Sequence, residues 1–190
     1  AADELARLNA VAEGLAGDMR ALVDATVRTE VDDEQVRAAR EHIAAATAIL
    51  QAQQLDGAFG VRFNTEPVGG KRNWGNAVCG LRNPVAPPLQ MSFDGEQLTG
   101  RAELGAAYEG PAGLVHGGIV AALLDQALGS AVESSGSPGM TGTLTIKYLQ
   151  GTKLGPLQIS AWLDRVDGVK SFAKGTVSTA DGITAEAEGV

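Results

Sequence analysis

The sequence is poor in the residues that several classes of protein require. It has one cysteine, Cys79, and two histidines, too few and too scattered for a disulfide scaffold or a metal site. No apolar run approaches the ~20 residues of a membrane span, and nothing resembles a signal peptide, which predicts a cytoplasmic protein without a membrane partner. The formal net charge of −8 argues against a nucleic-acid partner, because phosphate backbones attract basic surfaces.

What the sequence does contain is enough apolar surface for one core. With 44% hydrophobic residues over 190 positions, the chain can bury roughly 70% of its unfolded surface. Its charge is uneven, because residues 141–175 hold five basic residues against two acidic ones. An anionic ligand could bind this region despite the overall negative charge. The five basic residues are Lys147, Lys153, Arg165, Lys170 and Lys174.

The first 54 residues are predicted to form a helical hairpin. Apolar residues recur at three- and four-residue steps over 3–23 and again over 31–50, the period of an amphipathic helix. Asp32 or Asp33 would cap the second helix, and His42 within it is expected at the surface. We expect the hairpin to pack on another part of the chain.

Residues 55–90 are dense in Gly, Pro and Asn and show no lasting period, so they are predicted to be an ordered connection. Trp74 within it is expected to anchor the connection to the core, with a lid over a ligand as the alternative.

Residues 91–190 are predicted to form an α+β domain. Two strands precede a long apolar helix, and four strands follow it in a meander, which predicts an antiparallel sheet with the helix lying across it. The expected strands are 89–93, 97–104, 141–150, 156–166, 169–179 and 183–190.

The helix carries two unusual features, both within "GLVHGGIVAALLDQALG" at 113–129. Asp125 interrupts an otherwise apolar helix, where an unpaired buried carboxylate would cost several kcal/mol. Gly117 and Gly118 precede that helix and leave backbone N–H groups at its positive end, which suits a carbonyl oxygen that acquires negative charge. The alternatives are a structural role for His116 in a tight loop and an Asp125 bonded to strand hydroxyls.

The spacing of these features predicts a shared site. Asp125 lies eight residues beyond Gly117, about 12 Å along one helix, so a single helix cannot aim both at one reacting carbon. Two antiparallel copies related by a two-fold axis could place the Asp of one opposite the Gly of the other. The sequence therefore predicts a homodimer or a dimer of dimers.

Residues 101–190 resemble the hotdog-fold acyl-CoA thioesterases of the PaaI type, in the branch of thioesterase superfamily members with an N-terminal extension. The stretches "AYEGPAGLVHGGIVAALLDQALG", "MTGTLTIKYLQGTKLG" and "DRVDGVKSF" carry this resemblance. It implies a hotdog fold at 91–190, an antiparallel sheet wrapped around a long central helix. Residues 1–90 match the family motifs poorly, so the helical hairpin at 1–54 and the connection at 55–90 rest on the sequence pattern alone.

The resemblance also implies roles for individual residues. The N–H of Gly117 would polarise the thioester carbonyl, Gly118 would shape the same turn, and His116 would orient the site. Asp125 of the other subunit would activate water or attack directly, and Thr141 would hold the water.

Other positions of the family pattern concern the substrate. Lys147 and Lys170 would contact coenzyme A. Some relatives carry an asparagine six residues before the histidine, where this chain has Gly110, so any carbonyl contact made there is missing.

The functional hypothesis is hydrolysis of an acyl-CoA substrate to free acid and coenzyme A, without a metal or cofactor. The alternatives are a non-catalytic acyl-CoA-binding hotdog protein and a hotdog hydratase or dehydratase. The preferred acyl chain stays open at this stage.

Overall fold

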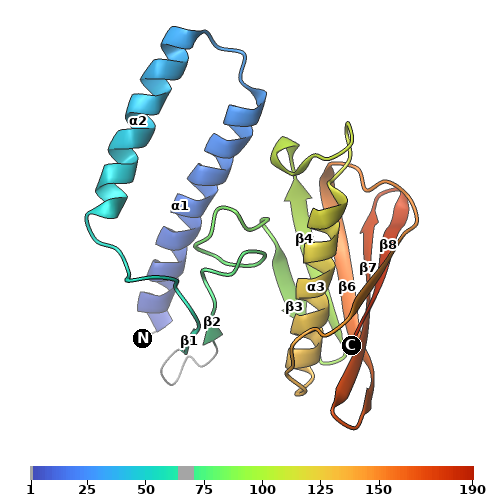
Figure 1. Ribbon diagram of the computed structural model, residues 1–190. Helices are drawn as coiled ribbons and strands as arrows, with labels where there is room; N and C mark the ends of the chain where they lie inside the picture. The colour runs from blue at the N-terminus through green and yellow to red at the C-terminus, as the bar shows by residue number, and fades with distance from the viewer. Residues whose placement is uncertain (1, 64–70) are drawn as a thin grey trace.

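The computed structural model describes residues 2–63 and 71–190 (Figure 1). Seven positions of the predicted connection, 64–70, lie outside the described residues. The N-terminal part contains two helices and a short two-stranded ribbon. These elements are α1 (Ala2–Arg28), α2 (Asp33–Gln51), β1 (Arg62–Phe63) and β2 (Lys71–Arg72).

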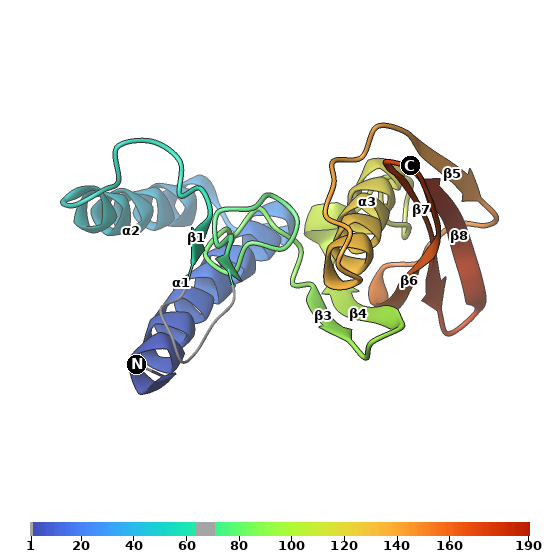
Figure 2. The same cartoon turned by 90° about the horizontal axis from the view of Figure 1, so that it is seen from below.

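The C-terminal part is a six-stranded antiparallel sheet curved around one long helix (Figures 1 and 2). This confirms the predicted α+β hotdog fold. The elements are β3 (Gln90–Phe93), β4 (Gln97–Leu104), η1 (Ala106–Tyr108), α3 (Gly117–Ser134), β5 (Leu144–Tyr148), β6 (Gly155–Asp167), β7 (Lys170–Thr179) and β8 (Gly182–Gly189).

The predicted meander is wrong in one respect. The strand order is β3-β4-β6-β7-β8-β5, so β5 pairs with β8 rather than with the next strand, β6. The place beside β6 is taken by β4, which pairs with it along its whole length. Residues 135–143 carry the chain to the far edge of the sheet, where the Gly142 and Thr143 N–H groups donate to the Val190 carbonyl. β5 is therefore an edge strand.

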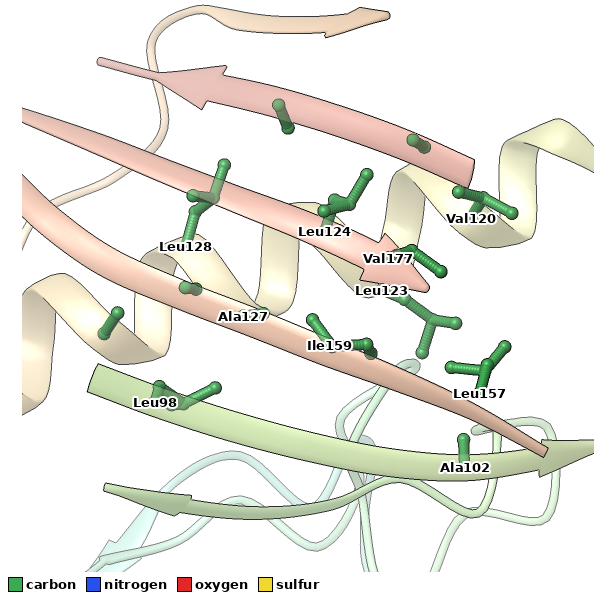
Figure 3. Close-up of a cluster of buried hydrophobic side chains, with 14 of the residues drawn as sticks. Leu98, Ala102, Val120, Leu123, Leu124, Ala127, Leu128, Leu157, Ile159 and Val177 are labelled. Carbon is green, nitrogen blue, oxygen red and sulfur yellow. The ribbon is translucent and has the colours of Figure 1, made fainter. Parts of the chain in front are cut away.

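The core lies between α3 and the concave face of the sheet (Figure 3). Strand β4 alternates exposed and buried residues, as a strand with one solvated face should. Two strand glycines allow the sheet to approach the helix closely, because a Cβ at Gly175 or Gly189 would lie 3.2 Å from the Leu128 side chain. Each large apolar side chain buried here contributes about 1.5–3 kcal/mol. The helix contributes Val120, Leu123, Leu124, Ala127, Leu128 and Ala131.

The two N-terminal helices form as predicted but differ in burial. α1 buries Ala12 and Ala16, and Arg20 donates hydrogen bonds to the carbonyls of Ala86 (3.0 Å) and Asn83 (3.3 Å). α2 begins at an Asp32 cap, whose carboxylate accepts from the Gln35 N–H at 2.9 Å, yet it buries no residue. Both figures place α2 on the side of α1 away from the sheet.

Trp74 packs within the connection and is not among the residues of the core cluster around α3, so its anchoring to that core stays a prediction. Trp74 is buried, its ring stacks on Phe59 with centroids 5.7 Å apart, and the Arg72 guanidinium lies 5.1 Å from its centroid. Among the helices of the described residues, none combines the length and apolar character needed to cross a bilayer.

Candidate active site at the start of the central helix

The turn that begins α3 is capped by a histidine side chain. The Nδ1 atom of His116 accepts a hydrogen bond from the Gly118 N–H at 2.9 Å. In a neutral imidazole, an accepting Nδ1 places the ring proton on Nε2. His116 thus holds the backbone of the turn, which fits the orienting role that the resemblance implies.

The Gly117 N–H differs from the next three backbone N–H groups in its hydrogen bonding. The Gly118 N–H is bonded to His116 Nδ1, and the Ile119 and Val120 N–H groups donate to the His116 carbonyl. Within the described part of the chain, the Gly117 N–H has no hydrogen-bond partner. This donor stands at the positive end of α3, where it can stabilise an oxyanion.

Backbone hydrogen bonds in the segment before the turn fix the position of His116. The His116 N–H donates to the Tyr108 carbonyl at 2.9 Å, and the Gly110 N–H donates to the Leu114 carbonyl at 2.9 Å. A Cβ at Gly110 would lie 2.8 Å from His116 Cα, so a side chain has no room there. Glycine at position 110, where some relatives carry asparagine, therefore fits the close approach of His116. Burial raises the pKa of the Tyr108 phenol, and the nearby Arg20 charge opposes that rise.

Asp125 lies on the face of α3 that is turned away from the sheet. The buried residues of the helix occupy the opposite face, and Gly118 and Gly129 on the Asp125 side are exposed. The Asp125 Oδ1 atom is buried and, among residues 2–63 and 71–190, has no hydrogen-bond partner. The expected alternative, an Asp125 bonded to strand hydroxyls, is therefore not formed by the described residues of one chain.

Thr141 and Lys170 come together at a second place. They line a cavity of about 400 Å³ between the C-terminal half of α3, the 137–143 loop and the start of β7. Leu128, Gly129 and Val132 form the helix wall of this cavity, beginning one turn beyond Asp125. Thr141 was expected on a strand, but β5 begins only at Leu144, so Thr141 lies in the loop before it.

The five basic residues of 141–175 separate into two groups. Lys153 pairs with Asp181 at 2.9 Å, whereas Arg165 and Lys174 both pair with Asp164 at 3.0 Å. The hydrogen bonds from Lys174 and Arg165 lower the pKa of Asp164.

Lys147 and Lys170 form no ion pair with any residue that the structure describes. They do not meet in one chain, because Lys147 lines a different hollow on the outer face of the sheet. They are the two lysines that the resemblance assigned to coenzyme A.

Sequence reasoning missed Tyr148. Its hydroxyl donates to the Gly117 carbonyl at 2.9 Å, across 31 positions of sequence. The strand pattern "LTIKY" predicted only that a strand ends near this residue. No local signal connects that strand end to the turn, because the contact depends on the edge position of β5.

Comparison with known proteins identifies relatives of the whole chain and of the hotdog part. A family model described as thioesterase superfamily matches residues 112–186. The crystal structure of protein RHA08564, a thioesterase superfamily protein, is 31% identical and has a TM-score of 0.82, covering 94% of this chain and 93% of that chain.

More distant similarity covers about half of this chain. The E. coli PaaI protein from the phenylacetic acid degradation operon is 19% identical, with a TM-score of 0.50 over 53% of this chain and 79% of its own. A hypothetical thioesterase protein with coenzyme A from Streptococcus pneumoniae TIGR4 is 21% identical, with a TM-score of 0.50 over 53% of this chain and 84% of its own. At these identities the likeness shows the fold alone.

Proposed function

The chain belongs to the thioesterase superfamily, and from this premise we propose that it hydrolyses acyl-CoA thioesters to a free acid and coenzyme A at a site shared by two copies of the chain. Membership of the superfamily supports thioester hydrolysis in general. The acyl-CoA substrate, the mechanism and the dimer are the proposal.

The observation that carries the proposal is a pair of unsatisfied groups on one helix. The Gly117 N–H and the Asp125 carboxylate have no hydrogen-bond partner among the described residues, and eight residues of helix separate them by about 12 Å. One is suited to stabilise an oxyanion and the other to accept a proton. A two-fold axis across α3 brings the Gly117 of one protomer to the Asp125 of the partner subunit.

The surface around Asp125 suits the approach of a second copy. Gly118, Ala122 and Gly129 share its face of α3, and their small side chains let another backbone come close. Among the described residues, strand β5 pairs only with β8, so its other side is a sheet edge to which a partner could add.

The proposed reaction uses water as the nucleophile. Asp125 of the partner subunit takes a proton from the water, whose oxygen forms a bond to the acyl carbon. The oxyanion of the tetrahedral intermediate accepts a hydrogen bond from Gly117 N–H. The carbon–sulfur bond then breaks, and the departing coenzyme A thiolate takes up the proton, so that a free acid and a thiol result.

Direct attack by Asp125 is the second route that the resemblance allows. It would form a mixed anhydride, which water then hydrolyses. Label in the Asp125 side chain after a single turnover in ¹⁸O-labelled water would establish the anhydride route, because it arises only when water attacks the Asp125 carbonyl of the anhydride. A released acid without label would establish the same route, because direct attack by water always labels the acid.

Lys170 and Lys147 are the cations that we assign to the phosphates of coenzyme A. Both lack an ion pair in the described part of the chain, unlike Lys153 and Lys174. Thr141 would hold the attacking water from the loop that lines the Lys170 cavity. The Streptococcus pneumoniae protein solved with coenzyme A shows that a protein of this fold can accept the ligand.

The test is incubation with a series of coenzyme A esters, from acetyl to palmitoyl and with aromatic esters included, while a thiol-reactive dye is monitored. Release of free thiol above that of the Asp125→Asn variant supports the proposal. An altered acyl chain without free thiol would indicate a hydratase, and binding without any reaction would indicate a carrier protein. Either result would overturn the proposed hydrolysis.

A further inference from the structure

We propose that Tyr148 is a positioning residue, which aims the Gly117 N–H by holding the adjacent peptide group. This inference rests on the proposed function, because it concerns the donor that would stabilise the oxyanion. It adds a residue from β5, an element that the sequence did not connect with the turn.

The peptide group between Gly117 and Gly118 is held at both ends by side chains. Its carbonyl accepts from the Tyr148 hydroxyl at 2.9 Å, and its N–H donates to His116 Nδ1 at 2.9 Å. Because a peptide group is planar and rigid, two bonds to its opposite ends fix its orientation. The orientation of this peptide group fixes the backbone on the C-terminal side of Gly117. The N–H of Gly117 itself is the donor that has no partner among the described residues.

The turn needs such a constraint because of its composition. Two consecutive glycines have the widest conformational freedom of any pair, and they occupy the first turn of α3, where intrahelical bonds are missing. The Tyr148 ring also covers the turn, since a Cβ at Gly117 would lie 3.5–3.7 Å from its hydroxyl and ring carbons. The tyrosine therefore restricts a segment that would otherwise sample several backbone states.

Because of where Tyr148 lies, its role at the turn can be tested without disturbing the fold. It is the last residue of an edge strand, and 52% of its surface is exposed. It is not part of the buried core, so removing its hydroxyl should leave the fold intact.

The main experiment compares Tyr148→Phe with the wild type on the best thioester substrate. Loss of one hydrogen bond to the carbonyl should lower kcat by about three- to ten-fold. KM should change by less than about two-fold, and the melting temperature should stay close to that of the wild type. Thr145→Ala, which removes a hydroxyl from the same strand, is the matched control and should leave kcat unchanged.

A double-mutant cycle tests whether Tyr148 and His116 hold the same peptide. If they do, the kcat losses of Tyr148→Phe and His116→Ala should be non-additive, with the second substitution costing less once the first is present. Unchanged kcat in Tyr148→Phe, or strictly additive losses, would overturn the inference.

Amide hydrogen exchange provides a readout that does not depend on activity. In Tyr148→Phe the amide of Gly118, whose N–H is bonded to His116 Nδ1, should exchange faster than in the wild type, whereas amides of β4 should not change. If the wild type hydrolyses no thioester, the proposed function fails, and this exchange experiment still decides whether Tyr148 holds the turn. Unchanged exchange at Gly118 would contradict the inference even if the enzyme is active.

Discussion

The hotdog part and the N-terminal hairpin differ in how their apolar residues are used. Around α3, buried apolar side chains from strands β4, β6, β7 and β8 pack with those of the helix, partly buried ones from β3 and β5 pack against them, and Leu104, Leu123 and Leu124 are fully buried. In α2, every residue is exposed, including Val36, Ile43 and Leu50 at helical spacing. Both α2 and α3 carry apolar residues at helical spacing, but within the described part of the chain only α3 buries them against other elements.

This difference shows that hydrophobic periodicity predicts a helix or a strand, but not what that helix or strand packs against in the fold. Most of the stability of a helix in a protein comes from the packing of its apolar face. α3 packs one face against strands of the sheet, whereas α2 buries no residue against the described part of the chain. We therefore expect the chemistry and the stability of one chain to depend on the hotdog part, and substitutions in α2 to be tolerated.

The largest expected effect is on catalysis in the hotdog part. Asp125→Asn should lower kcat by about 10²- to 10⁴-fold, because it removes a positioned base. The melting temperature should not fall, since the carboxylate makes no hydrogen bond to a described residue that the amide would lose. Steady-state kinetics and thermal unfolding of the same preparation measure both. Near-normal turnover would show that Asp125 is structural.

The next effect concerns the core between α3 and the sheet. Leu124→Ala should lower the free energy of unfolding by about 2–5 kcal/mol, because it leaves a cavity at a fully buried position. Urea unfolding monitored by circular dichroism gives the value. A loss below about 1 kcal/mol would mean that the packing around this helix is far looser than the structure shows.

A smaller effect is expected on substrate binding. Lys170→Glu should raise KM several-fold more than it lowers kcat, and the KM of the wild type should rise with salt, because a phosphate contact is screened. Lys153→Glu makes the same change of charge at a lysine already paired with Asp181 and is the matched control. Equal KM values for the two variants would place coenzyme A elsewhere.

The smallest effect is expected in α2. Ile43→Ser should change the free energy of unfolding of the single chain by no more than about 0.5 kcal/mol, because this side chain is on the surface. Denaturant unfolding at low protein concentration makes the measurement. A loss above about 1 kcal/mol would show that α2 is buried against something in solution and would remove the contrast between the two regions.

Much of the hotdog part could be predicted from sequence, because its signals are local. β4 has the predicted bounds, and α3 begins at Gly117, within the glycine pair that was expected to precede the helix. The pairing of β5 with β8 could not be predicted, since alternation shows that a strand exists and not which neighbour it takes. The same reason explains why Tyr148 was missed, whereas Thr141 was placed on a strand because the predicted strand began three residues before β5 does.

At the candidate site, the spacing of Gly117 and Asp125 was informative because a helix has a fixed rise per residue. What spacing could not show was that both groups lack partners, which depends on the surrounding chain. The exposure of α2 could not be predicted either, because the sequence predicts an amphipathic helix but does not show what covers its apolar face.

The shared site is the central claim, and two variants that each lack half of it test it most directly. Asp125→Asn removes the base, and Gly117→Pro removes the N–H. Proline should be accepted at this first helical position, because His116 before it has φ −58° and ψ 132°, which suits a residue preceding proline. Both variants should fold, as circular dichroism will show, and each alone should be nearly inactive.

The two variants are then mixed in equal amounts and refolded together. Random pairing should yield about half mixed dimers, each with one intact site, and hence about one quarter of the wild-type activity. As a control, a chain with both substitutions mixed with wild type should retain about one quarter of the activity, whereas sites contained in one chain would retain about one half. Activity near one quarter in the first mixture is the predicted result. Activity no higher than the separate baselines, from folded and freely exchanging variants, would contradict the shared site.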